Sequence, residues 1–280
     1  MTQTLSLAAP RSISSTAGDA TLKAAARLWL LVAVIGQWAF LYYIVAFYGS
    51  PTLTGHFEAW RRNTMLFKGY VAGDTAGNLS FAAHVLLAAV IAFGGALQLI
   101  PWIRSRVPAV HRWNGRLFML TALGVSLSGL YMIWVRGGNP TLVGDLAISG
   151  DALLIIAFAA LAWSAARARD IPAHRRWALR LYLVANGQWF FRVGLFAWIM
   201  VNRGPVGVGK NLDGPFALFW DFACYLLPLA VLELYLRAKE GAGPGRRFAV
   251  AGGLAILTVL TGVGIFGVYM AMWRPLLGRA

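Results

Sequence analysis

The chain has 280 residues, of which 59% are hydrophobic and only 12% are charged. Soluble globular domains carry about twice that charged fraction, so the composition excludes an ordinary soluble domain and indicates a protein that crosses a membrane several times. A formal net charge of +15 would suggest nucleic-acid binding in a soluble chain. Here the arginines lie in short loops between apolar runs, where membrane topology explains them, and we expect the lipid bilayer rather than nucleic acid as the partner.

We expect an all-α fold, a polytopic membrane bundle of seven transmembrane helices. A spanning helix needs about 20 largely apolar residues, and seven segments fulfil this. In chain order they are 27–48, 80–102, 115–135, 149–166, 178–201, 216–236 and 248–273. Residues 1–26 lack the apolar core of a secretory signal and are expected to be a flexible cytoplasmic tail. The transmembrane domain is then 27–273, with a core at 80–201, and residues 274–280 form an outer tail.

Lys and Arg are unequally divided between the two sides of the predicted bundle. Sixteen lie in the N-terminal tail and in the loops 103–116, 167–180 and 237–247, whereas eight lie on the opposite side and Arg192 lies inside the fifth span. Cytoplasmic loops of membrane proteins are enriched in Lys and Arg. We therefore expect the N-terminus in the cytoplasm and the C-terminus on the outer side.

An eleven-residue motif occurs twice, each time between two apolar runs. PAVHRWNGRLF at 108–118 and PAHRRWALRLY at 172–182 align at Pro, Ala, Arg, Trp, Arg and Leu. Proline suits the first turn of a helix, where its missing N–H costs no hydrogen bond, and Trp and Arg suit the membrane interface. The repeat predicts a duplicated helix pair in the core of the bundle, with an interfacial anchor in each copy.

The histidine is the part of the motif that shifts between the copies. His111 lies three residues after its proline and His174 lies two after its own, so the imidazoles differ by about 100° around their helices. Two imidazoles from neighbouring helices are the axial ligands of a six-coordinate haem iron. His84, about five residues inside the second span, adds an ionisable group at membrane depth. These three residues predict cofactor binding, namely haem b for transmembrane electron transfer; the alternative for His84 is a hydrogen bond to Asp151 or to a backbone carbonyl.

Other polar residues also fall inside the predicted spans. Arg192 is the most costly, since an unpaired charge at this depth costs about 3 kcal/mol on insertion scales, and Asp221 on the next helix is its expected partner. A small-molecule or proton-coupled transporter centred on Arg192, Asp221, Gln188 and Asn186 is the alternative function, and a non-catalytic membrane scaffold or assembly protein is a third. The other polar residues expected in the interior are Asp151 and Gln98. No common catalytic motif accompanies them, so whether the protein is an enzyme stays open.

Two pairs of small residues, each four positions apart, predict close contact between helices. Gly124 and Ser128 form one pair in the third span, and Thr258 and Gly262 form the other in the seventh. Helix packing explains both pairs without a further function.

Several of these features occur together in a defined order. A histidine early in one span, GALQLIP at the end of that span, HRWNGRLF and later AHRRWALRLY follow one another. In this combination the region of residues 80–200 resembles a bacterial membrane-protein family, domain of unknown function 2306 (DUF2306). The resemblance implies a multi-pass protein of the bacterial inner membrane and supplies no established activity. In that membrane the distribution of Lys and Arg predicts that the C-terminus lies in the periplasm. The paired histidines are also similar, more weakly, to those of cytochrome b561-like electron carriers, although only His84 lies well within a span here.

Overall fold

A computed structural model describes residues 13–63, 69–137, 140–241 and 243–278 of the chain. Over these residues the fold is helical and contains no strand. The long helices are α1 (Ile13–Ile44), α3 (Thr75–Leu99), α5 (Pro108–Trp134), α6 (Leu142–Arg167), α9 (Pro215–Gly241) and α10 (Pro244–Val268). Two helices of 15 residues each, α7 (Ile171–Ala185) and α8 (Gly187–Val201), lie between α6 and α9. The predicted all-α membrane bundle is confirmed.

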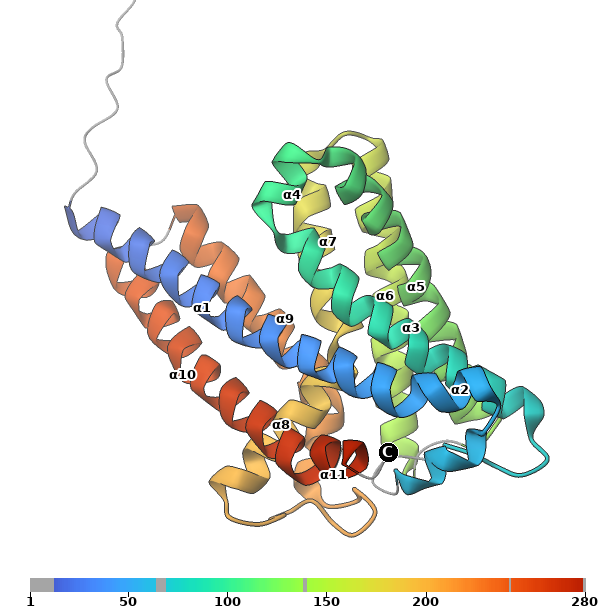
Figure 1. Ribbon diagram of the computed structural model, residues 1–280. Coiled ribbons are helices and arrows are strands. Elements are labelled where there is room, and N and C mark those ends of the chain that lie inside the picture. Colours follow the sequence, from blue (N-terminus) through green and yellow to red (C-terminus); the bar gives the residue numbers. More distant parts are fainter. Residues whose placement is uncertain (1–12, 64–68, 138–139, 242, 279–280) are drawn as a thin grey trace, which may run out of the picture.

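Within the described part of the chain, six helices are long and apolar enough to cross a membrane. The predicted fifth span, 178–201, is divided between α7 and α8, and α8 by itself is shorter than the about 20 residues of a crossing. The two short helices follow each other through the bundle, and α1 begins at one end of the bundle while α11 (Arg274–Leu277) lies at the other (Figure 1). The expected seven passes are therefore six long helices and one interrupted pass.

Helix α1 begins inside the segment that we expected to be a flexible tail. Residues 13–26 are helical, with Leu22 buried against α9 and α10 and Asp19 paired with Arg247 at 3.2 Å. An alanine-rich segment has a high helix propensity, and this packing stabilises it. The tail therefore does not include 13–26, and residues 1–12 lie outside the described part. At the other terminus α11 (Arg274–Leu277) is helical as well.

The bundle consists of neighbouring helix pairs. Helix α3 packs along α5 and α6 packs along α7, which is the duplicated pair expected from the repeat, while α1 packs along α10 and joins it to α3. The two motif copies begin α5 and α7 at the same end of the bundle, close to the short helix α4 (Pro101–Arg106) (Figure 1). We refer to this end, where Pro108 and Pro172 lie, as the motif end.

The motif residues adopt the same local arrangement in both copies. Each proline lies in the first two positions of its helix. The guanidinium of Arg116 lies 4.7 Å from the centre of the Trp113 ring, and that of Arg180 lies 4.8 Å from the ring of Trp177. Such Arg–Trp pairs combine a charged group with an amphipathic ring, as an interfacial anchor requires.

Aromatic side chains close the end of the bundle opposite the motif end. Tyr43, Phe47, Tyr48 and Trp273 are buried there together with Trp60 from a 3₁₀ helix, η2 (Phe57–Arg62). Two of the contributing segments are π-helical, η1 (Val45–Gly49), which leads into α2 (Ser50–Thr54), and η3 (Tyr269–Trp273), which leads into α11. π-helical turns are rare and occur frequently at functional sites.

Close contact between α8 and α10 depends on a glycine that the small-residue pattern missed. A Cβ atom on Gly264 would lie 2.1 Å from the carbonyl oxygen of Val193, whereas a Cβ atom on Gly262 would meet nothing within 4 Å among the described residues. Two positions apart on a helix, these residues face nearly opposite directions. The expected contact at Gly262 is therefore wrong. The pair in α5 does lie at a close contact between helices, since a Cβ atom on Gly124 would lie 3.0 Å from Cδ1 of Leu87 on α3.

Gly264→Ala is expected to destabilise the protein by about 1–3 kcal/mol, because the added methyl group forces α10 away from the backbone of α8. The measurement is thermal unfolding of the detergent-purified protein. Gly262→Ala is the matched control on the same helix and is expected to leave the unfolding temperature unchanged or slightly raised. Equal effects of the two substitutions would contradict the close contact.

Candidate functional site

The interruption between α7 and α8 lies at Asn186. The backbone N–H of Asn186 donates to Leu183 rather than to Tyr182, and the Asn186 side chain donates to the Tyr182 carbonyl instead, at 2.7 Å. The backbone carbonyl of Asn186 accepts from the N–H groups of Trp189 and Phe190, both at 2.9 Å. The side-chain amide thus satisfies a backbone group that the interruption releases, which membrane interiors require.

Gly187, the first residue of α8, allows a carboxyl group to approach the helix. A Cβ atom at this position would lie 2.5 Å from Oδ2 of Asp151 on α6, so only glycine leaves room for the Asp151 side chain. Asp151 is 5% exposed, and its Oδ1 is buried with no hydrogen-bond partner among the described residues. A carboxyl group therefore lies beside the first turn of α8 with part of its hydrogen-bonding capacity unused.

Arg192 lies one helical turn further along α8. Its Nη1 donates to the Gln188 carbonyl at 2.6 Å, and its guanidinium carbon lies 5.6 Å from the centre of the Phe40 ring on α1. Its Nε is buried and has no partner in the described structure. The expected ion pair with Asp221 is wrong, since Arg192 faces α1 while Asp221 faces a separate pocket.

Both groups line a central cavity with a volume of about 200 Å³. Its walls come from α1, α3, α5, α6, α7, α8 and η3, and they are apolar over most of their area. The polar side chains that line it include His84, Ser126, Asp151, Asn186, Gln188 and Arg192. A mostly apolar pocket with a few convergent polar groups is the usual form of a small-molecule site.

His84 enters this cavity from α3. Its Nδ1 lies 3.0 Å from Oγ of Ser128, whose hydroxyl also lies 2.7 Å from the Gly124 carbonyl. When Ser128 donates to that carbonyl, Nδ1 of His84 donates to Ser128 and Nε2 keeps its lone pair. The expected alternative of a hydrogen bond to Asp151 is replaced by one to Ser128, although both residues line the same cavity.

Hydroxyl and amide groups form the wall of the cavity away from the motif end. Nδ2 of Asn63 donates to the Tyr48 hydroxyl at 2.7 Å and to the Tyr43 hydroxyl at 3.1 Å. Asn63 Oδ1 is buried without a partner among the described residues. These groups extend the polar lining from α1 to the segment after η2.

An ion pair lies beside this wall. Arg136, which also lines the cavity, donates from Nε to Oδ2 of Asp74 at 2.8 Å and from Nη2 to Oδ1 of Asn78 at 2.7 Å. Asp74 caps α3 by accepting from the N–H of Gly77. The Arg136 hydrogen bond, aided by that of Gly77, lowers the pKa of the Asp74 carboxyl below its ordinary value of 3.8. The pair connects the start of α3 to the end of α5.

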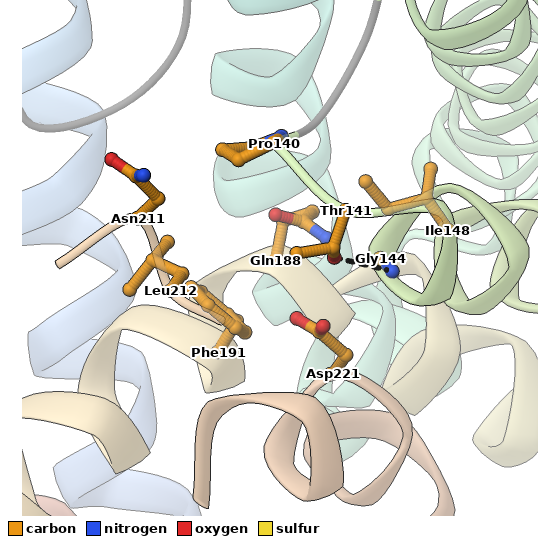
Figure 2. Close-up of a pocket in the computed structure, with 9 residues that line it drawn as sticks. All are labelled: Pro140, Thr141, Gly144, Ile148, Gln188, Phe191, Asn211, Leu212 and Asp221. Carbon is orange, nitrogen blue, oxygen red and sulfur yellow. Dashed lines mark hydrogen bonds between the residues drawn. The ribbon is translucent and has the colours of Figure 1, made fainter. Parts of the chain in front are cut away.

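Asp221 belongs to a second, much smaller pocket of about 20 Å³, enough for one water molecule. Figure 2 shows the side chains of Asp221 and Gln188 in this pocket, beside Thr141, whose hydroxyl accepts from the N–H of Gly144. Gln188 lines both the pocket and the central cavity. Of the residues expected to form a transport centre, Asn186, Gln188 and Arg192 are thus brought together, and Asp221 lies apart.

The other predicted site residues lie towards the motif end. His111 is half-buried in the first turn of α5, and its Nδ1 is buried with no hydrogen-bond partner among the described residues. His174 is half-buried in the first turn of α7, with Nδ1 2.9 Å from the Ala162 carbonyl. The two imidazoles are close enough to interact electrostatically. Gln98 donates to the carbonyl of His111 at 3.0 Å and so fixes α3 to α5. Neither imidazole lines the cavity that holds His84.

Three features of the site were missed from the sequence. The interruption had a visible signal, because Asn-Gly at 186–187 is a turn dipeptide inside an apolar run. The cluster of Tyr43, Tyr48 and Asn63 had no visible signal in the sequence, since its members lie in different segments. The ion pair of Asp74 and Arg136 joins two loops far apart in the chain.

Comparison with known proteins finds a family model that matches part of the chain. Residues 81–209 match the family model described as "Predicted membrane protein (DUF2306)". The matched region begins within α3 and ends after α8, so it contains His84, Asp151 and Arg192. The expected DUF2306 resemblance is thereby confirmed. No curated protein and no solved structure matches the chain, and the similarity to cytochrome b561-like proteins receives no support from these comparisons.

The ion pair of Asp74 predicts a pH-dependent contribution to stability. Because its folded-state pKa is lowered, the contribution is present above the ordinary value of 3.8 and is lost as the pH falls through the folded-state pKa. Asp74→Asn is expected to lower the unfolding temperature at pH 7, with a difference from wild type that disappears at the acidic end of a pH series. In an Arg136→Gln background the same substitution is expected to have little pH-dependent effect, and an unchanged effect there would contradict the assignment.

Proposed function

We propose that the protein binds a small molecule in the central cavity and moves it across the membrane, with Arg192 and Asp151 as the main binding groups. The observation that carries this proposal is that Asp151 is buried and Arg192 is partly buried at an interrupted helix, and that each has a buried polar atom with no partner among the described residues. Charged groups at membrane depth are costly and occur where a substrate, an ion or water meets them.

The interrupted helix supports transport rather than a scaffold role. Discontinuous helices in transporters expose backbone groups and half-helix termini at the binding site, and α7 and α8 meet at the wall of the cavity beside Asn186, Gly187 and Gln188. A purely structural bundle gains nothing from an unpaired arginine and an unpaired carboxyl group in the same cavity.

We further propose that this multi-pass protein lies in the bacterial inner membrane with its motif end in the cytoplasm. The enrichment of Lys and Arg in the N-terminal segment and in the loops before α5, before α7 and before α10 supports this orientation. The cavity wall formed by Tyr43, Tyr48 and Asn63 then lies towards the periplasm.

The test is a screen of small metabolites for a rise in unfolding temperature, followed by uptake of the binding compounds into proteoliposomes. Arg192→Gln is expected to reduce both binding and uptake at least about tenfold, since a hydrogen bond to a charged group contributes about 1.5–3 kcal/mol. Arg203→Gln, in the exposed loop after α8, is the control and should leave both unchanged. Binding that survives Arg192→Gln would contradict the proposal.

Haem b binding with transmembrane electron transfer is the second candidate, through His84 and through the pair His111 and His174. The tautomer of His174 favours it, because its Nδ1 lies 2.9 Å from the Ala162 carbonyl and must donate to it, which leaves the lone pair on Nε2. Histidine ligands of metals usually donate their other ring N–H in this way. The cavity supplies only one imidazole, so a six-coordinate iron fits the pair near the motif end better. Among the described residues no group of three or more His, Cys, Asp or Glu residues offers a site for a bare metal ion.

A dithionite-reduced minus oxidised absorption spectrum tests the haem candidate after expression with ample haem. Bands of b-type haem are expected, and they should be lost in His174→Ala because an axial ligand is removed. His56→Ala is the control, since His56 is exposed and its ring forms a hydrogen bond with the Thr54 hydroxyl. A spectrum without haem bands would exclude this candidate without affecting the cavity proposal.

A further inference from the structure

Among the described residues, Arg192 is the cavity-lining cation without an acidic partner. The cavity is also lined by Arg136, but that guanidinium is paired with Asp74. Arg192 forms no ion pair in the described structure, and its Nε is a buried donor without an acceptor there. Arginine keeps its charge in proteins, and in a medium of low dielectric this charge needs a partner of the opposite sign. The site therefore lacks an anion.

A second unused donor lies on the wall formed by Tyr43 and Tyr48. Both hydroxyl oxygens accept from Nδ2 of Asn63, and they lie 3.4 Å from each other, so one hydroxyl can donate to the other. The proton of the remaining hydroxyl then has no acceptor among the described residues. Both tyrosines line the cavity and are close enough to Arg192 to interact with it electrostatically. The unused hydroxyl and the guanidinium therefore belong to the same part of the cavity.

The carboxyl group of Asp151 does not supply the missing negative charge. It forms no ion pair with Arg192 in the described structure and lies against Gly187 instead. Burial without a cation beside it favours the neutral form of a carboxyl group. An anion at Arg192 therefore meets no competing negative charge from Asp151.

The rest of the cavity determines the body of this anion. Away from the polar groups the walls are aliphatic and aromatic, including Phe81, Ile91, Val125 and Ile155. A volume of about 200 Å³ is below the range of about 300–1,000 Å³ found for drug-sized ligands. The body must be apolar and small. One guanidinium neutralises one negative charge, so a singly charged head group fits and a phosphate dianion does not.

From these features we propose that the cavity binds a small monocarboxylate with an apolar body, of the type of a short branched-chain fatty acid. The carboxylate accepts from the guanidinium of Arg192 and from the unused hydroxyl of the Tyr43 and Tyr48 pair. A neutral molecule of the same shape would leave Arg192 without a counter-charge. This inference rests on the proposed function, since it assigns the chemical class of the molecule that the cavity binds.

The test compares three probes on the detergent-purified full chain by isothermal titration, in a buffer without carboxylates. The probe 4-methylpentanoate carries the charge and the apolar body, 4-methylpentanamide is its neutral counterpart of the same shape, and acetate lacks the body. Wild-type protein is expected to bind 4-methylpentanoate about 10- to 100-fold more tightly than the amide, the range of one charged hydrogen bond. It should also bind this probe at least about tenfold more tightly than acetate, because the apolar body leaves water.

Two results on wild-type protein would overturn the inference. Equal affinity for 4-methylpentanoate and 4-methylpentanamide, or no binding of 4-methylpentanoate, would exclude an anion site. Equal affinity for 4-methylpentanoate and acetate would contradict the apolar body. These comparisons hold even if a variant fails to fold.

Variants assign the preference to its residues. Arg192→Gln is expected to reduce the ratio of carboxylate to amide affinity to about one, whereas Arg203→Gln, in the exposed loop after α8, should keep the wild-type ratio. The double substitution Tyr43→Phe and Tyr48→Phe is expected to weaken 4-methylpentanoate binding at least about tenfold. Tyr42→Phe, at an exposed position of the same helix, is its control and should bind as wild type does. Full affinity in the double variant would contradict the role of the tyrosine hydroxyls.

The ligand class and the transport function can fail separately. If another compound from the metabolite screen binds in an Arg192-dependent manner while 4-methylpentanoate does not bind, the monocarboxylate class is wrong and the proposed transport function stands. If 4-methylpentanoate binds with the expected preference but is not taken up into proteoliposomes, the ligand class stands and the transport function is wrong.

Discussion

A guanidinium group inside a bilayer requires partners that apolar helices do not supply, and the arrangement around Arg192 follows from this requirement. The group receives one carbonyl, from Gln188, and one aromatic ring, from Phe40. Neither provides a negative charge. The interruption at Asn186 brings further polar groups to the same cavity, so several polar groups together, rather than one ion-pair partner, stabilise the guanidinium charge.

The interruption also links the repeat to the cavity. The second motif copy begins α7 at the motif end, and α7 ends after 15 residues, where the polar wall of the cavity begins. The first copy begins α5, which continues for 27 residues and supplies Ser126 and Ser128 to the cavity region. The two copies therefore share an anchor and differ in the length of the helix that each begins. The duplicated helix pair has one continuous member and one interrupted member, and the interruption lies at the site.

The helical class, the spans and the starts of α5 and α7 could be predicted because each depends on local composition. Runs of apolar residues and prolines before them carry that information within a short window. The direction in which a side chain points from its helix cannot be predicted in this way. Arg192 and Asp221 lie on consecutive helices, α8 and α9, yet Arg192 lines the central cavity and Asp221 lines the small pocket. In the same way, Gly262 lies four residues after Thr258, as a small-residue contact requires, but it is Gly264 that faces the backbone of α8. Partners such as Ser128 for His84 emerge only from the packing of α3 on α5.

The contact of Gly264 with the backbone of Val193 has a mechanical consequence. It fixes α8 to α10, while α7 packs on α6 and α9, so the two halves of one membrane pass belong to different groups of helices. A rotation of α8 and α10 against α6 and α7 would bend this pass where α7 meets α8, at Asn186 and Gly187. Because Asn186 lines the cavity, such a rotation would change the shape of the cavity directly.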